Sequence, residues 1–171
     1  MDARIRGTVM PVLEVALDPG DALIAEAGQL SWMTDSIRLS TSTRGAAGGV
    51  FGAVRRAMAG AGLFMTEYTA HRDPGSVSFA AKLPGQILPI QIHKDREYLV
   101  HRHGFLCAAG DVRVALSFQR RLGAGIFGGD GLFLAALTGP GRVWLQSLTI
   151  TNLAHSLIPY LPFPEPGPQS R

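Results

Sequence analysis

Short apolar runs, separated by residues that favour turns, recur along most of the chain. Residues 9–17 form the first run, and Asp-Pro-Gly-Asp at 18–21 supplies turn geometry after it. Near the other end, residues 132–137 and 142–148 flank Thr-Gly-Pro-Gly and predict a β-hairpin. Further runs cover residues 22–27, 30–33, 37–41, 63–70, 77–83, 87–92, 98–100 and 112–118. Short strands in such close succession are typical of sandwiches and barrels, so the pattern predicts an all-β fold.

Residues 44–62 depart from this pattern because they are rich in alanine and glycine. Phe51, Val54 and Met58 lie three and four positions apart, a spacing that places them on one face of a helix. The segment therefore predicts one short helix between glycine hinges. Such a helix would cap an open end of the β structure, or act as a mobile lid or a lipid-surface contact.

The C-terminal region changes period a second time. Leu153, Leu157 and Leu161 fall four positions apart, and Thr151 or Asn152 can cap a short helix that contains them. Beyond it, prolines alternate with other residues to the end, which favours an extended segment. We expect one β domain over residues 1–161 and a proline-rich, disordered tail over residues 162–171.

An internal repeat links distant parts of the sequence. Residues 23–30 resemble residues 99–106, which lie 76 positions later. Residues 60–69 resemble residues 129–138, which lie 69 positions later. These offsets predict two copies of one β unit, with an insertion in the first copy where the helix is expected.

Composition limits the class of protein. Charged residues make up 17% of the 171 residues and hydrophobic residues 46%, which excludes a disordered chain. The formal net charge is +3, and the positive charges are spread along the sequence. The single cysteine, Cys107, cannot form an internal disulfide, and neither an export signal nor a transmembrane helix is recognisable. A cytoplasmic protein is the expectation.

Three histidines are the candidate metal ligands. His101 and His103 lie two apart on a predicted strand, so both side chains leave one face, and His93 can approach from a neighbouring strand. Spaced cysteines or paired carboxylates do not accompany them, so we expect no resident metal or cofactor. Cys107 stands beside two alanines, which favours a small buried side chain over a nucleophile.

Several motifs, in order along the chain, resemble those of one protein family. They are Leu-Asp-Pro-Gly-Asp at 17–21, Ala-Glu-Ala-Gly at 25–28, Pro-Gly-Gln-Ile at 84–87, Gly-Phe-Leu at 104–106, Phe-Gly-Gly-Asp-Gly-Leu-Phe-Leu at 127–134 and Gly-Pro-Gly-Arg-Val-Trp-Leu-Gln at 139–146. The family contains uncharacterised bacterial proteins and the fungal altered inheritance of mitochondria protein 24. The resemblance implies repeated β units with a fold similar to that of the tryptophan RNA-binding attenuation protein, and assembly into symmetric oligomers. It implies no catalytic residues.

The chain departs from the longer members of that family. Those members carry the Gly-Gly-acid-Gly motif twice after a first glycine-rich copy, whereas here the motif occurs once, at 127–134. We therefore expect about one β unit to be missing, which would leave apolar strand edges for another subunit to cover. Trp144 or Trp32 is the candidate buried anchor of that contact. The predicted interaction surface consists of Phe51, Val54, Met58, Ile126, Phe127, Phe133 and Trp144.

These observations rank three functions. The leading hypothesis is a non-enzymatic, homo-oligomeric β scaffold or binding module, dimeric or trimeric, with a membrane surface or another protein as a further partner. A metal-dependent enzyme that uses the three histidines ranks third, behind an RNA-binding protein. In that second hypothesis the RNA is bound by surface arginines, which are Arg44, Arg55, Arg56, Arg120 and Arg121.

Overall fold

The computed structural model describes residues 1–41, 65–119 and 132–162. Strands dominate these ranges, which confirms the all-β prediction. The N-terminal half contains β1 (Asp2–Arg6), β2 (Val12–Leu17), β3 (Ala22–Glu26), β4 (Trp32–Met33), β5 (Ile37–Thr41), β6 (Met65–Ala70) and β7 (Gly75–Ala80). The C-terminal half contains β8 (Ile87–Ile92), β9 (Glu97–His101), β10 (Phe105–Gly110), β11 (Arg113–Gln119), β12 (Leu132–Thr138) and β13 (Gly141–Gln146). The helix predicted within 44–62 and nearly all of the predicted tail lie outside the described residues.

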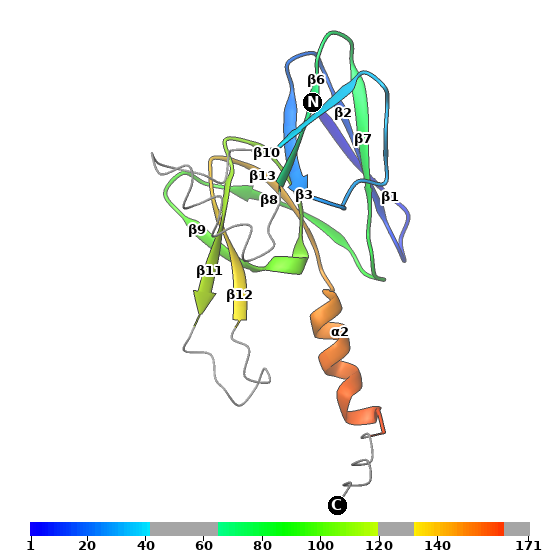
Figure 1. The fold of residues 1–171 in the computed structure, drawn as a ribbon, viewed down its shortest axis with the longest axis vertical. Coiled ribbons are helices and arrows are strands. Elements are labelled where there is room, and N and C mark those ends of the chain that lie inside the picture. Colours follow the sequence, from blue (N-terminus) through cyan, green and yellow to red (C-terminus); the bar gives the residue numbers. More distant parts are fainter. Residues whose placement is uncertain (42–64, 120–131, 163–171) are drawn as a thin grey trace, which may run out of the picture.

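The strands form three antiparallel sheets that lie in layers (Figure 1). A central sheet contains six strands in the order β5-β6-β3-β10-β13-β8. A four-stranded sheet, β1-β2-β7-β4, packs on one face of the central sheet. A three-stranded sheet, β11-β12-β9, packs on the other face. Because the central sheet is covered on both faces, its strands can be apolar at consecutive positions.

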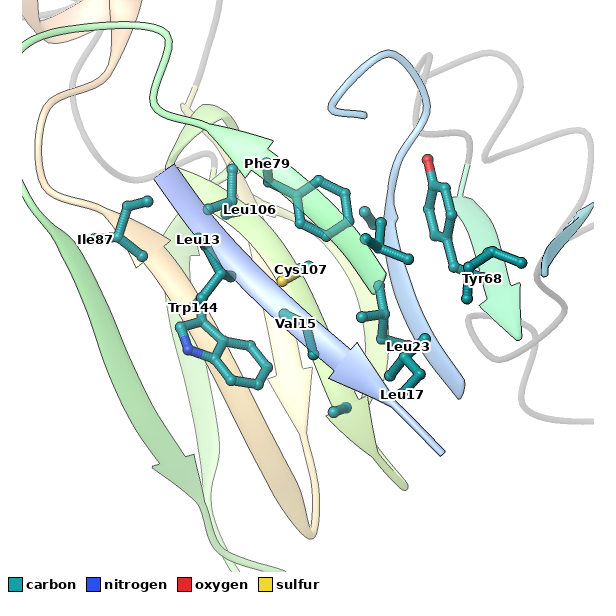
Figure 2. Packing of buried hydrophobic residues seen from close by; sticks show 14 of the residues in the cluster. Leu13, Val15, Leu17, Leu23, Tyr68, Phe79, Ile87, Leu106, Cys107 and Trp144 are labelled. Carbon is teal, nitrogen blue, oxygen red and sulfur yellow. The ribbon is translucent and has the colours of Figure 1, made fainter. Parts of the chain in front are cut away.

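Alternation along the central strands fills the two spaces between the layers. On β3, Leu23 and Ala25 join the cluster that faces the four-stranded sheet, whereas Ile24 joins the cluster that faces the three-stranded sheet. On β13, Trp144 and Val143 divide between the clusters in the same way. Figure 2 shows the first cluster, in which Trp144 lies among the apolar side chains of the opposing sheets. The core is therefore two apolar layers separated by one sheet.

The predicted hairpin over residues 132–148 is wrong. β12 pairs with β11 and β9 in the three-stranded sheet, whereas β13 pairs with β10 and β8 in the central sheet. The turn between them carries the chain from one layer to the next. The physical reason lies in β13, where Val143 and Trp144 point to opposite faces and both are buried, so the strand needs cover on both sides.

The two halves of the chain repeat one arrangement of six strands, which confirms the predicted duplication. In the first unit, β2 to β7, the strands pair in the orders β2-β7-β4 and β5-β6-β3. In the second unit, β8 to β13, they pair in the orders β8-β13-β10 and β11-β12-β9. One backbone hydrogen bond outside the strands also recurs at equivalent positions of the two units. Ala81 N–H donates to the Pro11 carbonyl at 2.8 Å, and Ser147 N–H donates to the Gln86 carbonyl at 2.9 Å.

Equivalent residues in the first four strands of each unit, β2 to β5 and β8 to β11, lie 75 positions apart. The sequence comparison predicted an offset of 76. Trp32 pairs with Ser78 in the first unit, and Cys107 pairs with Trp144 in the second. The predicted offset of 76 holds for the glycines of the turns after β3 and β9. The turn after β9 contains a 3₁₀ helix, η1 (Arg102–Gly104), and is one residue longer before its glycine.

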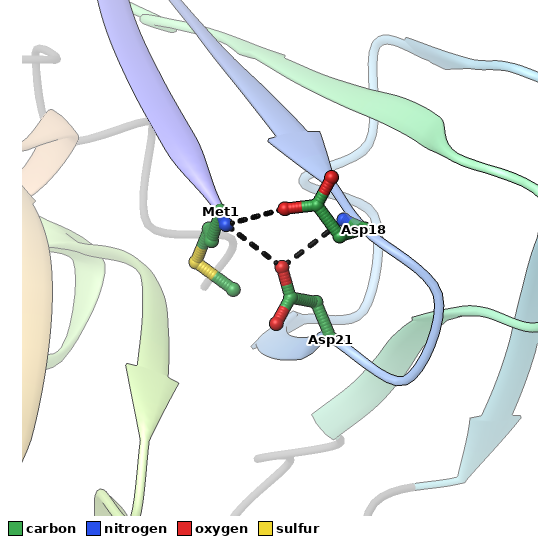
Figure 3. Close-up of polar contacts among 3 residues, drawn as sticks. All are labelled: Met1, Asp18 and Asp21. Atoms are coloured by element: carbon green, nitrogen blue, oxygen red, sulfur yellow. Dashed lines mark hydrogen bonds and ion pairs between the residues drawn. The ribbon is translucent and has the colours of Figure 1, made fainter.

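One strand that the sequence pattern does not predict, β1, forms an edge of the four-stranded sheet. It pairs with β2 from Asp2, opposite Ala16, onward. The Met1 α-ammonium group lies 3.0 Å from Oδ2 of Asp18 and 2.9 Å from Oδ2 of Asp21 (Figure 3). Hydrogen bonds to Asp21 and then to Asp18 raise the pKa of the ammonium group, and the bond from that group lowers the pKa of Asp21. These contacts hold the start of β1 against the turn after β2.

Candidate functional site

The predicted C-terminal helix is present as α2 (Ile150–Leu157). Its N-cap is Thr149, whose Oγ1 accepts a hydrogen bond from Asn152 N–H at 3.1 Å. The predicted caps, Thr151 and Asn152, are wrong because both lie inside the helix. A 3₁₀ turn, η2 (Ile158–Tyr160), follows α2, and both project away from the sheets (Figure 1).

Apolar side chains along this projection lack cover from the described residues. No residue of α2 or η2 is buried, and Tyr160 is 85% exposed. In the described ranges, no helix has the length and apolar content that spanning a membrane requires. The projection therefore offers apolar surface for a contact. Its exposed large apolar side chains are Ile150, Leu157, Ile158, Tyr160 and Leu161.

The structure brings together two of the three candidate histidines at the base of α2. The rings of His101 and His103 lie 5.5 Å apart, and His103 N–H donates to Nδ1 of His101 at 3.3 Å. His93 lies in the turn before β9, whereas His101 ends that strand, and β9 alone spans about 13 Å. Among the described residues, no three His, Cys, Asp or Glu side chains gather as metal ligands. The predicted grouping of the three histidines is therefore wrong.

The histidine pair joins α2 to the body of the protein. Nδ1 of His103 lies 3.2 Å from Oγ1 of Thr151, on the first turn of the helix. Burial lowers the pKa of His101 below its usual value, and the charges of His103 and His155 lower it further. His101 is therefore held in its neutral form at neutral pH, in which its Nδ1 can accept the hydrogen bond from His103 N–H.

Cys107 is a core residue, as the sequence predicts. Its side chain is fully buried, and burial raises the pKa of its thiol well above the usual value. A β-bulge between Phe105 and Cys107 places Leu106 beside Cys107 in one apolar cluster, while Phe105 joins the other. The thiol is therefore protonated and enclosed, and it has no access to a substrate.

The predicted interaction surface is only partly within the described residues. The backbone of Phe133 lies on β12, opposite Phe118. Trp144 is 2% exposed inside the core of the single chain, so its prediction as a surface residue is wrong. The alternation along β13 directs its ring between two layers. The remaining predicted residues, which lie outside the described ranges, are Phe51, Val54, Met58, Ile126 and Phe127.

The arginines of the RNA-binding hypothesis are also outside the described ranges. Two arginines that the structure does describe lie on β1 beside carboxylates. Arg4 contacts Asp2 at 3.0 Å, and Arg6 forms an ion pair with Glu14. Their charge is therefore balanced locally. The residues whose grouping the structure leaves untested are Arg44, Arg55, Arg56, Arg120 and Arg121.

Among the described residues, the edge strands β1, β4, β5, β8 and β9 each expose a large apolar side chain, and the largest exposed fractions on β4 and β9 belong to Trp32 and Leu99. Trp32, on β4 at the edge of the four-stranded sheet, is 50% exposed. Leu99, on β9 at the edge of the three-stranded sheet, is 45% exposed. Trp32 was predicted as an anchor, but Leu99 was not. The run Tyr-Leu-Val at 98–100 is apolar throughout, and such a run does not tell which side chain faces the core.

A small cavity of about 210 Å³ opens beside the base of α2. Gln29 is 7% exposed, and its Oε1 has no hydrogen-bond partner among the described residues. Nearby, Arg102 and Glu26 form an ion pair at 3.6 Å. Glu26 and Gln29 both line this cavity, but Oε1 of Gln29 is itself buried. The lining of the cavity consists of Glu26, Gln29, Lys82, Leu83, His103, Gln146 and Ile150.

Comparison with known proteins identifies relatives. A family model described as mitochondrial biogenesis AIM24 matches residues 3–154. An uncharacterized protein from Streptococcus pyogenes serotype M6 is 27% identical over 157 residues, which cover 86% of this chain and 62% of that protein. The crystal structure of a Streptococcus pyogenes protein matches with a TM-score of 0.64 and 23% identity, over 86% of this chain and 64% of that chain. This chain therefore spans less than two thirds of the length of either relative.

These matches agree with the motifs that suggested the family. The structural match shows a shared fold, and the relatives' descriptions assign no activity to either of them. The family model covers all of the described strands except the first residue of β1, together with the first five residues of α2. The chain belongs to the mitochondrial biogenesis AIM24 family.

Proposed function

We propose that this protein is a non-enzymatic β scaffold that works as a homo-oligomer. The observation that carries the proposal is the apolar surface of Trp32 on β4 and Leu99 on β9, two strands at sheet edges. Strand edges with unpaired backbone groups, and apolar side chains beside them, favour association with another protein surface. The exposed apolar side chains of α2 and η2 add a second contact region.

The layered core supports a structural role. The central sheet joins both units through the β3–β10 pair, and its strands β3, β10 and β13 have buried side chains on both faces. Tyr68 and Phe79 meet edge to face at 5.7 Å across one interlayer space. Such close packing makes the body rigid, so edges and projecting elements keep fixed positions for contacts.

Light scattering on the purified chain tests this proposal. We expect a monodisperse particle at micromolar concentration whose mass is a multiple of 18.2 kDa. Raising the salt concentration from about 0.1 M to about 1 M should leave the mass unchanged, because salt screens charge pairs but does not weaken apolar contacts. A monodisperse particle of 18.2 kDa would contradict the proposal.

A further inference from the structure

The joint between the two units of this chain is a strand pair with a defined register. β3, the edge strand of the first unit's β5-β6-β3 group, pairs antiparallel with β10, the edge strand of the second unit's β8-β13-β10 group. Ala25 lies opposite Cys107, and Ile24 lies opposite Ala108. At this joint Ile24 and Cys107 are 1% and 0% exposed.

The same two edges recur elsewhere in the chain without such a partner. By the 75-position offset, β9 in the second unit is equivalent to β3, and β4 in the first unit is equivalent to β10. Among the described strands, β9 pairs only with β12, and β4 pairs only with β7. Within the described strands, each unit thus has one edge that is used in the internal joint, and an edge equivalent to its partner's joint edge that has no strand beside it.

The side chains on the two unpaired edges are exposed, whereas their equivalents at the joint are buried. Leu99 is equivalent to the buried Ile24, and Trp32 is equivalent to the buried Cys107. Leu99 is 45% exposed and Trp32 is 50% exposed. These positions are therefore apolar in both units but covered only where the joint exists.

We propose that β4 of one copy pairs antiparallel with β9 of a second copy and reproduces the β3–β10 joint between molecules. The internal register transfers directly: Met33 lies opposite Leu99, and Trp32 lies opposite Val100. This pairing brings Trp32 and Leu99 into the new interface. It rests on the proposed function, because it specifies how the homo-oligomer forms.

The pairing makes the contact head-to-tail. Each copy uses β4 toward one neighbour and β9 toward the other, so the two surfaces in contact are different. Contacts of this kind produce a closed ring when the rotation between copies closes. In such a ring every β4 and β9 edge is paired.

Cysteine cross-linking between two differently substituted chains tests the register. Met33→Cys protein is mixed with Leu99→Cys protein, the subunits are exchanged under reducing conditions, and the mixture is oxidised and run on a non-reducing gel. We expect a covalent dimer in the mixture and none with either variant alone, because each single variant places a cysteine on only one side of the contact. Native Cys107 is buried and present in every sample, so a cross-link through Cys107 would also be seen with each single variant.

A mixture of Met33→Cys with Glu97→Cys is the matched control. Glu97 lies on the same strand and face as Leu99 but two residues along, where side-chain separation exceeds disulfide reach. We expect about tenfold less covalent dimer than with Leu99→Cys. Equal cross-linking in both mixtures, or cross-linking within one single variant, would overturn the proposed register.

Charge substitution provides a second, independent readout. Leu99→Lys should reduce the particle mass measured by light scattering to 18.2 kDa. Leu88→Lys, which alters a side chain of similar exposure on β8, should leave the mass unchanged. Circular dichroism checks that both variants fold.

The outcomes separate this inference from the proposed function. If the unsubstituted chain is a monomer, both fail. If it is an oligomer but Met33→Cys and Leu99→Cys do not cross-link, the scaffold proposal stands and the β4–β9 pairing is overturned.

Discussion

Gly141, the first residue of β13, lies against the backbone of β10 more closely than any side chain allows. A Cβ atom at this position would lie 2.3 Å from the carbonyl oxygen of Ala109 and 2.5 Å from Cγ2 of Val112. The first contact is with backbone, so an alanine here must push β10 and β13 apart. Those strands pair at the centre of the sheet that joins both units, and their separation would disturb both apolar layers.

Gly75 is the equivalent residue of the first unit and provides a matched control. It lies opposite Leu17, as Gly141 lies opposite Ile92. A Cβ at Gly75 would lie 2.5 Å from Oγ of Ser36 and 2.6 Å from Cδ1 of Ile37, both of which are side-chain atoms and not backbone. The two substitutions therefore add the same methyl group against different obstacles.

Overpacking of a well-packed interior costs about 1–3 kcal/mol, and backbone obstacles give the upper end of that range. We expect Gly141→Ala to lower the free energy of unfolding by about 3 kcal/mol and Gly75→Ala by about 1 kcal/mol. For a domain of this size, these values correspond to decreases in Tm of roughly 6–12 °C and 2–4 °C.

Urea unfolding at one fixed protein concentration, followed by tryptophan fluorescence, measures both values. Fluorescence is suitable because the buried ring of Trp144 becomes exposed on unfolding. Equal destabilisation by the two substitutions, or a loss below about 1 kcal/mol for Gly141→Ala, would refute the argument from backbone contact.

Three further predictions concern single side chains. Thr149→Ala should destabilise α2 by about 1 kcal/mol through loss of its N-cap, seen as faster hydrogen exchange of the helix amides, whereas Ser156→Ala should change little. The thiol of Cys107 should react with a disulfide reagent only as fast as the chain unfolds, because burial raises its pKa; rapid reaction in the native state would contradict this. His101 has a lowered pKa, so the unfolded chain binds more protons below about pH 6.5, and stability should fall as the pH drops from about 7.5 to about 5.5. His101→Gln should flatten that decrease in urea midpoints.

Local chemistry in the sequence determined the elements of this protein and their repetition. Alternating apolar residues and turn residues such as Asp-Pro-Gly act over a few positions, so the strand content and the breaks between strands could be predicted. The spacing of Leu153 and Leu157 likewise predicted α2. The duplication was visible because both units need glycines and apolar residues at matching places. Its offset was misjudged by one because the turn after β9 is longer.

Only the tertiary structure decided which strands are neighbours. A two-residue period shows which side chains share a face of a strand, but not whether another layer covers that face. Trp144 and Trp32 look alike in sequence, yet one is enclosed between two sheets and the other lies at an open edge. β1 escaped prediction because its stability comes from pairing with β2 and from the contacts of Met1 with Asp18 and Asp21. Burial is a property of contacts between distant segments, and a local pattern does not contain those contacts.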